Sequence, residues 1–346
     1  PPRRWPVGCV GREPRRGRGM TGLIYDARFL EHDPGPSHPD QPGRLQTVMG
    51  RLEASRIWPR LRQIPFEPAG RKWIERIHTA AYIDRLYAAC EAGERYIDSP
   101  ECAISPLTAE TARLAAGGVL AAVDAVMAGE VRNAFCAVRP PGHHAEADRA
   151  MGFCFFNHVA IAAEYLVEHH GLERVAVVDF DVHHANGTQH SFESRDDVMV
   201  ISLHEHPDYL YPGTGRIYEI GVGEGSGATL NIPLDPEAGD AEYREAFLKR
   251  VIPVLDNFRP QFVLLSTGFD AAEHDQLAHM RVSPHGFEWM TAQLKAVADR
   301  HAGGRLVSVL EGGYNPAQLS ESTLLHVATL LEDETGDPHM AKKAGL

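Results

Sequence analysis

The sequence predicts a three-layer α/β fold in which helices cover both faces of a central, mostly parallel sheet. Two observations lead to this class. Short runs of apolar and β-branched residues alternate with longer amphipathic segments along the chain. These short runs are apolar throughout, which is typical of strands buried between two layers of helices. Strands are therefore expected at 134–138, 175–178, 198–203, 261–265 and 306–310.

Helices are expected between and around these strands. The segment 109–129 shows the pattern clearly, because Leu114 and Leu120 stand among many alanines, which favours a packed helix with small neighbours. Strands separated by helices in this way favour parallel pairing. In chain order the expected helices are 45–56, 109–129, 157–170, 241–257, 284–301 and 316–331.

The composition is that of a soluble globular chain, with 346 residues of which 43% are hydrophobic and 23% are charged. No run approaches eighteen consecutive apolar residues, so a membrane partner is not expected. The five cysteines are scattered and form no Cys-x-x-Cys pair. This favours reduced thiols in a cytoplasmic protein over a disulfide framework or a thiolate zinc site.

Charge is distributed unevenly along the chain. Residues 1–19 contain six arginines and one acid, whereas the formal net charge of the whole chain is −13. The acidic remainder would repel phosphate backbones, so nucleic acid is not expected as a partner. Residues 1–19 are rich in Pro, Gly and Arg without periodicity, which predicts a disordered or extraneous extension, with a nucleic-acid arm as the alternative. Residues 20–346 are then expected to form a single domain.

Four of the apolar runs end in polar motifs that carry glycine or histidine. In open parallel sheets the ligand crevice lies beyond the carboxyl ends of the strands. We therefore expect the four motifs to meet in one site, although they are far apart in the sequence. In chain order they are Arg139-Pro-Pro-Gly-His-His144, Asp179-Phe-Asp-Val-His-His184, Ser266-Thr-Gly-Phe-Asp270 and Glu311-Gly-Gly-Tyr314.

Asp181 and His183 in the second motif predict a metal site. Alternate residues of an extended segment share a face, so these two side chains and Asp179 are expected to point the same way. Asp270 supplies a third ligand from another strand end. Two carboxylates and an imidazole leave room for water and substrate, as in a catalytic zinc site, and they also suit iron(II) or cobalt(II). A hydrogen-bonded Asp181–His183 pair without metal is the simpler alternative.

His143 and His144 are candidates for acid–base chemistry, because histidine can take up and release protons near neutral pH. They follow a Pro-Pro-Gly turn that fixes the direction of the imidazoles. Asp179 and Asn186 are the expected partners of the pair. An aspartate partner favours an imidazolium, whereas an asparagine only fixes orientation, so the two histidines are expected to titrate differently.

Tyr314 is a candidate for stabilising an oxyanion. It follows two glycines that allow close approach of the backbone. A phenol aimed at a carbonyl can stabilise the negative charge that forms as the carbonyl becomes tetrahedral. Taken alone, the Gly-Gly-Tyr sequence would more simply be a turn with a packed aromatic side chain.

Taken together, these residues resemble the zinc-dependent histone deacetylase superfamily, in particular its class II branch and the bacterial histone deacetylase-like amidohydrolases. The resemblance runs in order from about Tyr25 to beyond Asn315 and includes His32-Asp-Pro34, His38-Pro39 and Arg44-Leu45. Two further matching stretches are Met151-Gly-Phe-Cys-Phe-Phe-Asn157 and Tyr211-Pro-Gly-Thr-Gly215. The resemblance implies an arginase-like fold with an eight-stranded sheet, one zinc ion per chain, and hydrolysis of N-ε-acetyl-lysine to lysine and acetate.

The resemblance also implies a role for each matching residue. His144 would be the general base and acid, His143 its electrostatic companion, and Tyr314 the group that polarises the carbonyl. The implied zinc ligands are Asp181, His183 and Asp270, with Asp179 and Asn186 as partners of the histidines. The implied walls of a narrow substrate tunnel are Gly152, Phe153 and Tyr211. A structural potassium or sodium ion is implied near Asp179, Asp181, His183, Ser202 and Leu203.

Two positions depart from the family pattern. Leu277 stands where polyamine-selective eukaryotic relatives have a glutamate that attracts a cationic substrate, which weakens the expectation of polyamine selection by a glutamate there. Ala185 stands where the family usually has glycine, and it would be strained by about 1 kcal/mol if its φ were positive.

Several alternatives stay open at this point. One is a small-molecule amidohydrolase acting on acetylpolyamines or other acylamines. Another is an arginase-like ureohydrolase with two manganese ions, although two-metal sites generally need more bridging carboxylates than Asp179, Asp181 and Asp270 provide. A third is a module that binds acylated lysine without cleaving it. Assembly into a homo-oligomer is also left open.

Overall fold

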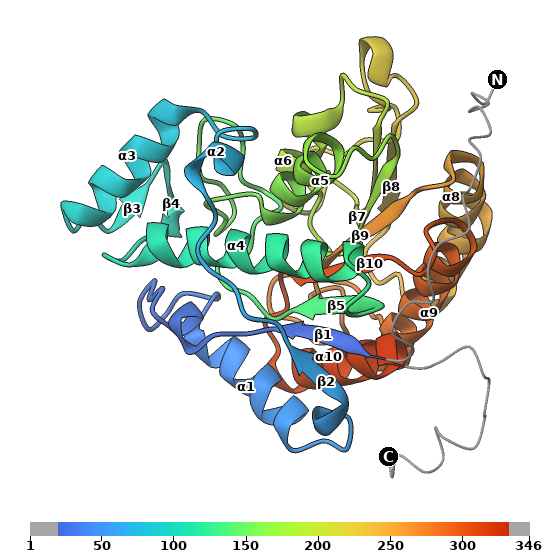
Figure 1. The fold of residues 1–346 in the computed structure, drawn as a ribbon, viewed down its shortest axis with the longest axis horizontal. Helices are drawn as coiled ribbons and strands as arrows, with labels where there is room; N and C mark the ends of the chain where they lie inside the picture. The colour runs from blue at the N-terminus through green and yellow to red at the C-terminus, as the bar shows by residue number, and fades with distance from the viewer. Residues whose placement is uncertain (1–19, 332–346) are drawn as a thin grey trace.

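The computed structural model describes residues 20–331, and the predicted extension at 1–19 lies outside them. The strands of its main sheet are β1 (Thr21–Ile24), β2 (Leu61–Gln63), β5 (Asn133–Cys136), β6 (Val175–Asp179), β7 (Val198–Glu205), β8 (Thr229–Leu234), β9 (Phe262–Thr267) and β10 (Leu306–Leu310). Their order is β2-β1-β5-β10-β9-β6-β7-β8, and each neighbouring pair is parallel (Figure 1). The predicted fold class is therefore confirmed.

Helices form a layer on each face of this sheet, as Figure 1 shows. One face is covered by α4 (Thr108–Met127), α5 (His158–Glu168) and α6 (Asn186–Phe192). The other face carries α10 (Pro316–Leu331) and α9 (Pro284–His301), and α1 (Pro42–Glu53) packs on α10. The layers are thus helix, sheet and helix, and only the ends and edges of the sheet are left for loops.

Smaller elements complete the described part of the chain. A two-stranded antiparallel sheet pairs β3 (Tyr96–Ile97) with β4 (Ser99–Ala103). The helices outside the two main layers are α2 (Arg71–Ile74), α3 (Ala80–Glu91), α7 (Asp240–Ala246) and α8 (Ile252–Phe258). Single 3-10 turns lie at Ala27–Leu30, Trp58–Arg60 and Gly223–Gly225, and a π-helical turn at Phe247–Val251.

Side chains at the helix starts explain where the helices begin. The Asn157 side chain accepts a hydrogen bond of 2.9 Å from the Ala160 N–H and caps α5. At α9, the Ser283 hydroxyl accepts a hydrogen bond from Gly286, and Pro284 occupies the first turn, where a missing N–H costs nothing. The cap at Asn157 matters for the site, because this residue also contacts the histidine loop.

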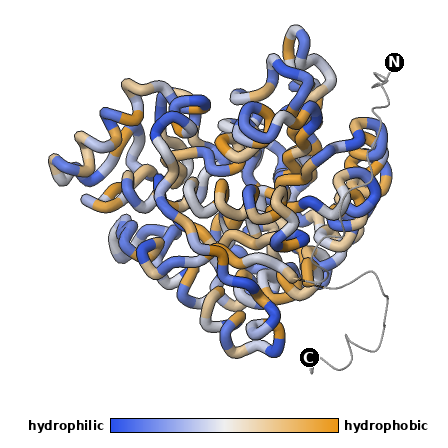
Figure 2. The backbone as a smooth tube through the Cα atoms, in the orientation of Figure 1, coloured by the Kyte–Doolittle hydropathy of each residue, from blue (hydrophilic) through white to orange (hydrophobic). Residues whose placement is uncertain are grey.

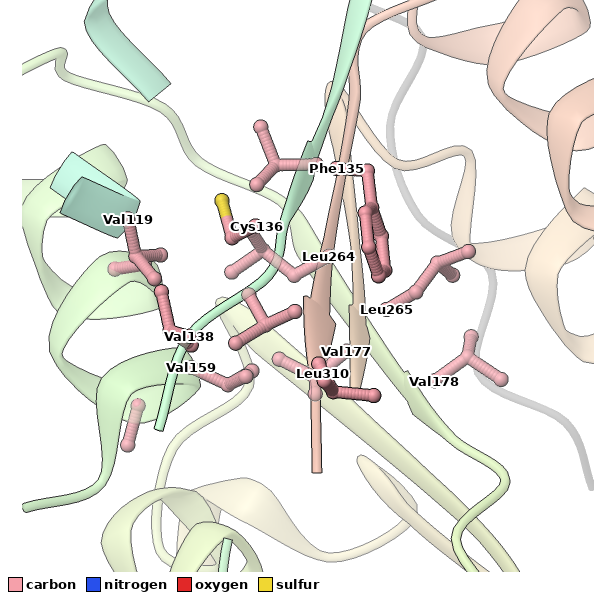
Figure 3. Close-up of a cluster of buried hydrophobic side chains, with 14 of the residues drawn as sticks. Val119, Phe135, Cys136, Val138, Val159, Val177, Val178, Leu264, Leu265 and Leu310 are labelled. Atoms are coloured by element: carbon pink, nitrogen blue, oxygen red, sulfur yellow. The ribbon is translucent and has the colours of Figure 1, made fainter. Parts of the chain in front are cut away.

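The core lies on both faces of the sheet. Val178 and Leu265 point to one face, whereas Val177 and Leu264 point to the other, as the two-residue period of a strand requires (Figure 3). All four side chains are completely buried. Figure 2 shows hydrophobic segments at the centre of the molecule and hydrophilic segments in the outer loops.

All five predicted strands are present, with ends that differ by at most two residues. The helix predicted at 241–257 is wrong as one helix, because α7 and α8 are separated by the π-helical turn Phe247–Val251. Pro253 lacks an N–H and cannot continue a regular helical ladder, which accounts for the break. The sequence patterns missed several elements that are short or lack a clear apolar period, namely β1, β2, β3, β4, β8, α2, α3 and α6.

Two further predictions concern properties of the chain as a whole. No helix of the described part combines the length and the apolar character that crossing a bilayer requires. Cys90, Cys102, Cys136 and Cys154 are buried free thiols, whereas Cys9 lies outside the described residues. The described cysteines therefore form no disulfide, as their spacing predicted.

Candidate active site

Four neighbouring strands of the sheet carry the site. The strands β5, β10, β9 and β6 lie side by side, and the four polar motifs follow directly after their carboxyl ends. These motifs contribute to a cavity of about 350 Å³ at this edge of the sheet. The residues that line it are Glu101, Pro141, His143, His144, Gly152, Phe153, His183, Leu210, Tyr211, Leu277, Gly312 and Tyr314.

Asp181, His183 and Asp270 come together beside this cavity, which His183 lines. One ligand atom from each lies within 4.8 Å of the others. His183 Nδ1 is 3.0 Å from Asp181 Oδ1 and 3.2 Å from Asp270 Oδ2. Asp181 and Asp270 are buried behind His183, which itself reaches the cavity. The three side chains therefore converge on one point although residues 180–184 lie beyond the end of β6.

Backbone N–H groups hold both carboxylates, and Asp181 Oδ1 accepts a 2.9 Å hydrogen bond from the His183 N–H. Asp181 Oδ2 accepts a hydrogen bond of 2.9 Å from the Gly312 N–H, and Asp270 Oδ1 accepts one of 2.9 Å from the Val182 N–H. Asp270 Oδ2 is buried and accepts no hydrogen bond of good geometry from the residues that the structure describes, although His183 Nδ1 lies 3.2 Å away. A buried carboxylate oxygen without a donor is unfavourable unless a cation is present.

The electrostatics of the cluster also fit a divalent cation. Burial and the neighbouring Asp181 carboxylate raise the pKa of Asp270 to about 7, although His183 opposes the shift. Burial disfavours the charged form of His183, but Asp181 and Asp270 outweigh it and raise the pKa of His183 to about 10. Two buried carboxylates thus compete for one imidazole, and a cation bound to all three would relieve the excess negative charge.

His143 is paired with Asp179. Its Nδ1 lies 3.0 Å from Asp179 Oδ2, and both side chains are buried. Burial disfavours the imidazolium, but Asp181 and Asp179 outweigh it and raise the pKa of His143 to about 10. Asp179 therefore faces this histidine rather than the three-residue cluster, and the pair carries a positively charged imidazole at the cavity.

His144 has a different environment. Its Nδ1 lies 2.6 Å from Asn186 Oδ1, and its ring centroid is 4.0 Å from that of His143. Burial and the adjacent charge of His143 lower the pKa of His144 well below its usual value. The Asp179 carboxylate therefore favours the charged form of His143, whereas burial and the neighbouring His143 favour the neutral form of His144.

Close contacts around His144 and the carboxylates require glycine at several positions, of which Gly152 and Gly312 are two. A Cβ at Gly152, whose φ is +54°, would overlap the ring of His144. A Cβ at Gly312 would overlap Asp270 Oδ2. Both glycines therefore let the backbone pass directly beside the functional side chains.

Tyr314 borders the cavity from the loop after β10. Its backbone N–H donates a 2.7 Å hydrogen bond to Asp275, and its ring centroid is 5.9 Å from that of Phe153. Arg44 lies over the ring at 4.6 Å and donates hydrogen bonds to the Gly313 and Glu311 carbonyls. Burial raises the pKa of the Tyr314 phenol well above its usual value, although Arg44 opposes the shift. The phenol is thus held in place and stays protonated.

The cavity walls are mainly aromatic and aliphatic. Phe153, Leu210, Tyr211 and Leu277 all contribute to the lining. Phe153 has a left-handed backbone with φ +68°, and its ring meets His38 edge to face at 4.5 Å. These walls suit an extended apolar chain rather than a charged group.

Glu311 and Glu101 are carboxylates of this region that the sequence motifs did not single out as functional candidates. Glu311 is buried and accepts hydrogen bonds from the backbone N–H groups of Gly142 and His143, so it anchors the histidine loop. Glu101 lines the cavity from β4. Glu311 stands at the start of the Gly-Gly-Tyr motif and could have been noticed there, whereas nothing in the local sequence distinguishes Glu101.

Ala185 is unstrained. It has φ −75° and ψ 58°, so the strain considered for a positive φ does not arise. Close approach is instead required at Gly187, where a Cβ would overlap the Ala145 carbonyl oxygen. The glycine requirement in this segment thus lies two residues after Ala185.

Comparisons with known proteins agree with this fold. Residues 38–330 match the model of the histone deacetylase domain. The histone deacetylase-like amidohydrolase of Pseudomonas aeruginosa is 44% identical over 316 residues, which cover 86% of this chain and 82% of that protein. A probable deacetylase of Archaeoglobus fulgidus is 38% identical over 298 residues, which likewise cover 86% of this chain and 82% of that protein. A crystal structure of the HDA15 HD domain superposes with a TM-score of 0.86, at 36% identity and 90% coverage of each chain.

A parallel α/β sheet with this cluster beside an apolar cavity defines a hydrolase of the deacetylase and amidohydrolase class. The chain belongs to the histone deacetylase family.

Proposed function

We propose that this enzyme removes the acetyl group from N-ε-acetyl-lysine in peptides, in a zinc-dependent hydrolysis that yields lysine and acetate. The observation that carries the proposal is the position of Asp181, His183 and Asp270 beside two histidines in unlike states. This combination supplies a cation site, a neutral base and a fixed positive charge at one end of an apolar cavity.

Asp181, His183 and Asp270 would hold the zinc ion. Their two carboxylates and one imidazole form an oxygen- and nitrogen-rich set that suits zinc, and three protein ligands leave positions for reactants. Zinc, when bound, supplies a Lewis acid that polarises the acyl carbonyl and lowers the pKa of water. A structural potassium or sodium ion near Asp179 stays a prediction.

His144 is the general base of the proposed reaction. With Asn186 Oδ1 accepting from Nδ1, the Nε2 atom of His144 is unprotonated and available. It takes the proton from water as the water oxygen attacks the acyl carbon. The same proton is then delivered to the leaving amine nitrogen as the carbon–nitrogen bond breaks, so no covalent acyl-enzyme forms.

His143 and Tyr314 stabilise the charge that develops in this step. His143 is held as an imidazolium by Asp179, whose Oδ2 lies 3.0 Å from His143 Nδ1. The Tyr314 O–H donates a hydrogen bond to the acyl oxygen as that oxygen becomes negative. Both groups line the cavity and are oriented before substrate binds, so little reorganisation is needed.

The cavity walls would hold the alkyl chain of the lysine. Phe153, Tyr211 and Leu277 provide apolar contacts along a linear chain, and Gly152 leaves room beside His144. Leu277 places an apolar side chain at the lining position where a glutamate would attract a second ammonium group of a polyamine. The lining at this position therefore favours acetyl-lysine.

An acetylpolyamine is the alternative substrate, and Glu101 is the observation in its favour. Among the described residues that line the cavity, Glu101 is the only acidic one. Its carboxylate could attract the distal ammonium of a polyamine, but it could equally accept an N–H of a peptide backbone. A Glu101→Gln variant distinguishes the two, because glutamine keeps the acceptor oxygen and removes the charge.

The test is a parallel assay of an acetyl-lysine peptide and an acetylpolyamine on protein of known zinc content. We expect the peptide to be turned over with the higher kcat/KM and Glu101→Gln to change this value by less than about threefold. A higher kcat/KM for the acetylpolyamine, lost in Glu101→Gln, would replace the proposed substrate. Absence of turnover with either substrate would remove the proposal.

A further inference from the structure

Asn186 is itself held by a second carboxylate, Glu146, which the reaction outlined above does not use. Asn186 Nδ2 donates a 2.6 Å hydrogen bond to Glu146 Oε1 and a 3.2 Å hydrogen bond to the backbone carbonyl of His144. Asn186 Oδ1 faces His144 Nδ1 at 2.6 Å. All three contacts are buried, so water does not compete for them.

These contacts determine which way the Asn186 amide points. A carboxylate oxygen and a backbone carbonyl can only accept hydrogen bonds, so the atom facing both of them must be the amide nitrogen. The amide oxygen must then face His144. Because that oxygen only accepts, the proton of neutral His144 must sit on Nδ1, and Nε2 is left free.

Glu146 contributes the strongest of the contacts that hold the Asn186 amide nitrogen. Its hydrogen bond is shorter than the one to the His144 carbonyl, 2.6 Å against 3.2 Å, and it is formed to a charged acceptor. If Glu146 were absent, a rotated amide would lose only the longer contacts, which are those to the His144 carbonyl at 3.2 Å and to the Met151 sulfur at 3.4 Å. Its nitrogen could then donate to His144 Nδ1. His144 would then carry its proton on Nε2 and could not act as a base.

The position of Glu146 is fixed by a residue one helical turn further along α6. His190 Nδ1 lies 2.9 Å from Glu146 Oε1 and 3.0 Å from Oε2. Asn186 and His190 are four residues apart on α6, so they lie on one face of the helix, and the carboxylate spans both. The Glu146 side chain is 10% exposed and that of His190 is 42% exposed, so the chain of contacts runs from the site to the surface.

This chain of contacts can orient His144, but it cannot carry protons between His144 and the surface. An amide nitrogen does not give up its proton in this range of pH, so Asn186 interrupts any proton path. We propose that Glu146, anchored by His190, is a positioning residue that fixes the Asn186 amide and thereby keeps Nε2 of His144 free to act as the base. This inference rests on the proposed function of His144.

The experiment compares Glu146→Ala and Glu146→Gln with the wild-type enzyme, using the zinc-loaded protein and an acetyl-lysine peptide. We expect Glu146→Ala to lower kcat about 10- to 100-fold, the usual range for a residue that orients a functional side chain, with KM within about twofold. Glu146→Gln keeps an oxygen that accepts from Asn186 and should recover most of kcat. Glu164→Gln is the matched control, because it alters a buried carboxylate that pairs with Arg76 and Arg195 away from the site.

A second readout is independent of turnover. Nitrogen-15 NMR of histidine-labelled protein reports which ring nitrogen of His144 carries the proton, with the signals assigned by comparison with His144→Ala. We expect a proton on Nδ1 in wild type and Glu146→Gln, and a substantial share on Nε2 in Glu146→Ala. Should wild type hydrolyse no acyl substrate while this tautomer change is seen, the proposed function fails and the positioning role stands.

Three results would overturn the inference. The first is a kcat in Glu146→Ala within twofold of wild type. The second is an unchanged Nδ1–H tautomer of His144 in that variant. The third is an equal loss of kcat in Glu146→Ala and Glu146→Gln together with an equal fall in melting temperature, which would indicate a purely structural carboxylate.

Discussion

Tyr314 contributes a single hydroxyl group to the proposed chemistry, while its ring is held by independent contacts. The ring packs against Arg44 and Phe153, and these contacts survive in Tyr314→Phe. We therefore expect this variant to keep its fold and zinc content but to lose about 100- to 1000-fold in kcat, as when one oxyanion donor is removed. The measurement is steady-state turnover with metal analysis.

The control for Tyr314→Phe is Tyr218→Phe. Tyr218 is 72% exposed and does not line the cavity, so its hydroxyl should be dispensable. If Tyr314→Phe turned over substrate as fast as wild type, the phenol would have no part in stabilising the oxyanion.

At the scale of single residues, functional candidates could be predicted from the sequence where residue type and spacing alone indicate the chemistry. Asp181 and His183 are two residues apart after a predicted strand. Because alternate residues of an extended segment share a face, this spacing predicts that their side chains point the same way. Glu146, Glu311 and Glu101 were missed because their roles depend on partners far along the chain. Glu311, for example, acts on a backbone N–H of Gly142, 169 residues away.

At the scale of elements, Gly187 sets how closely α6 approaches the histidine loop. A Cβ there would overlap the backbone oxygen of Ala145 and press on that of His143. Gly187→Ala should therefore displace α6, which carries Asn186, and lower the free energy of unfolding by about 1–3 kcal/mol, as overpacking does. The test measures urea unfolding and kcat on one sample of this variant. If neither the free energy of unfolding nor kcat changed, the close approach of α6 to the histidine loop would not matter as described.

Gly50 is a matched glycine on a helix with no such neighbour. It lies inside α1 in open space, where an added Cβ meets nothing within 4 Å. Gly50→Ala should raise the free energy of unfolding by about 0.5–1 kcal/mol, because alanine loses less backbone entropy in a helix. Urea unfolding measures the change, and a loss of stability would show that the surroundings of α1 differ from those described.

The prediction of elements succeeded where an apolar period extends over several residues. The helices at 284–301 and 316–331 have the predicted bounds, and β10 matches its predicted range. By contrast, α6 reads Asn-Gly-Thr-Gln-His-Ser-Phe, a polar segment with poor helix formers. It is a helix because Asn186, Thr188 and Gln189 are buried and bonded to neighbouring segments, which is information that only the tertiary structure holds.

At the scale of the whole molecule, buried neutral histidines link stability to pH. His326 is completely buried between Thr291 and Ser308, and burial lowers its pKa from 6.5 to about 3. Between these values the unfolded chain binds a proton that the folded chain does not. This contribution to stability is complete above pH 6.5 and is lost as the pH falls below it.

The test compares wild type with His326→Gln at pH 7.5 and 5.5. The wild-type free energy of unfolding should fall between these values by about 1.4 kcal/mol more than that of the variant, because one proton is taken up over about one pH unit below 6.5. The other titratable groups are common to both proteins, so their contributions cancel when the two falls in the free energy of unfolding are subtracted. Equal falls in the two proteins would mean that His326 takes up its proton as readily when folded as when unfolded.

The overall architecture was predictable because five of the eight strands of the main sheet, and the helices between them, show a clear apolar pattern in the sequence. The convergence of β5, β10, β9 and β6 then brings four distant motifs to one edge of the sheet. The order of the strands was not available from local sequence, since it depends on which crossover connections the whole chain adopts.

The central claim is that Asp181, His183 and Asp270 hold one catalytic zinc ion. Its most direct test is to strip the protein of metal and titrate it with zinc while following turnover of an acetyl-lysine peptide. We predict that turnover rises from the background to a plateau at one zinc per chain, and that Asp270→Asn gives no such plateau. Full turnover by metal-free protein, or a plateau only at two metal ions per chain, would contradict the account.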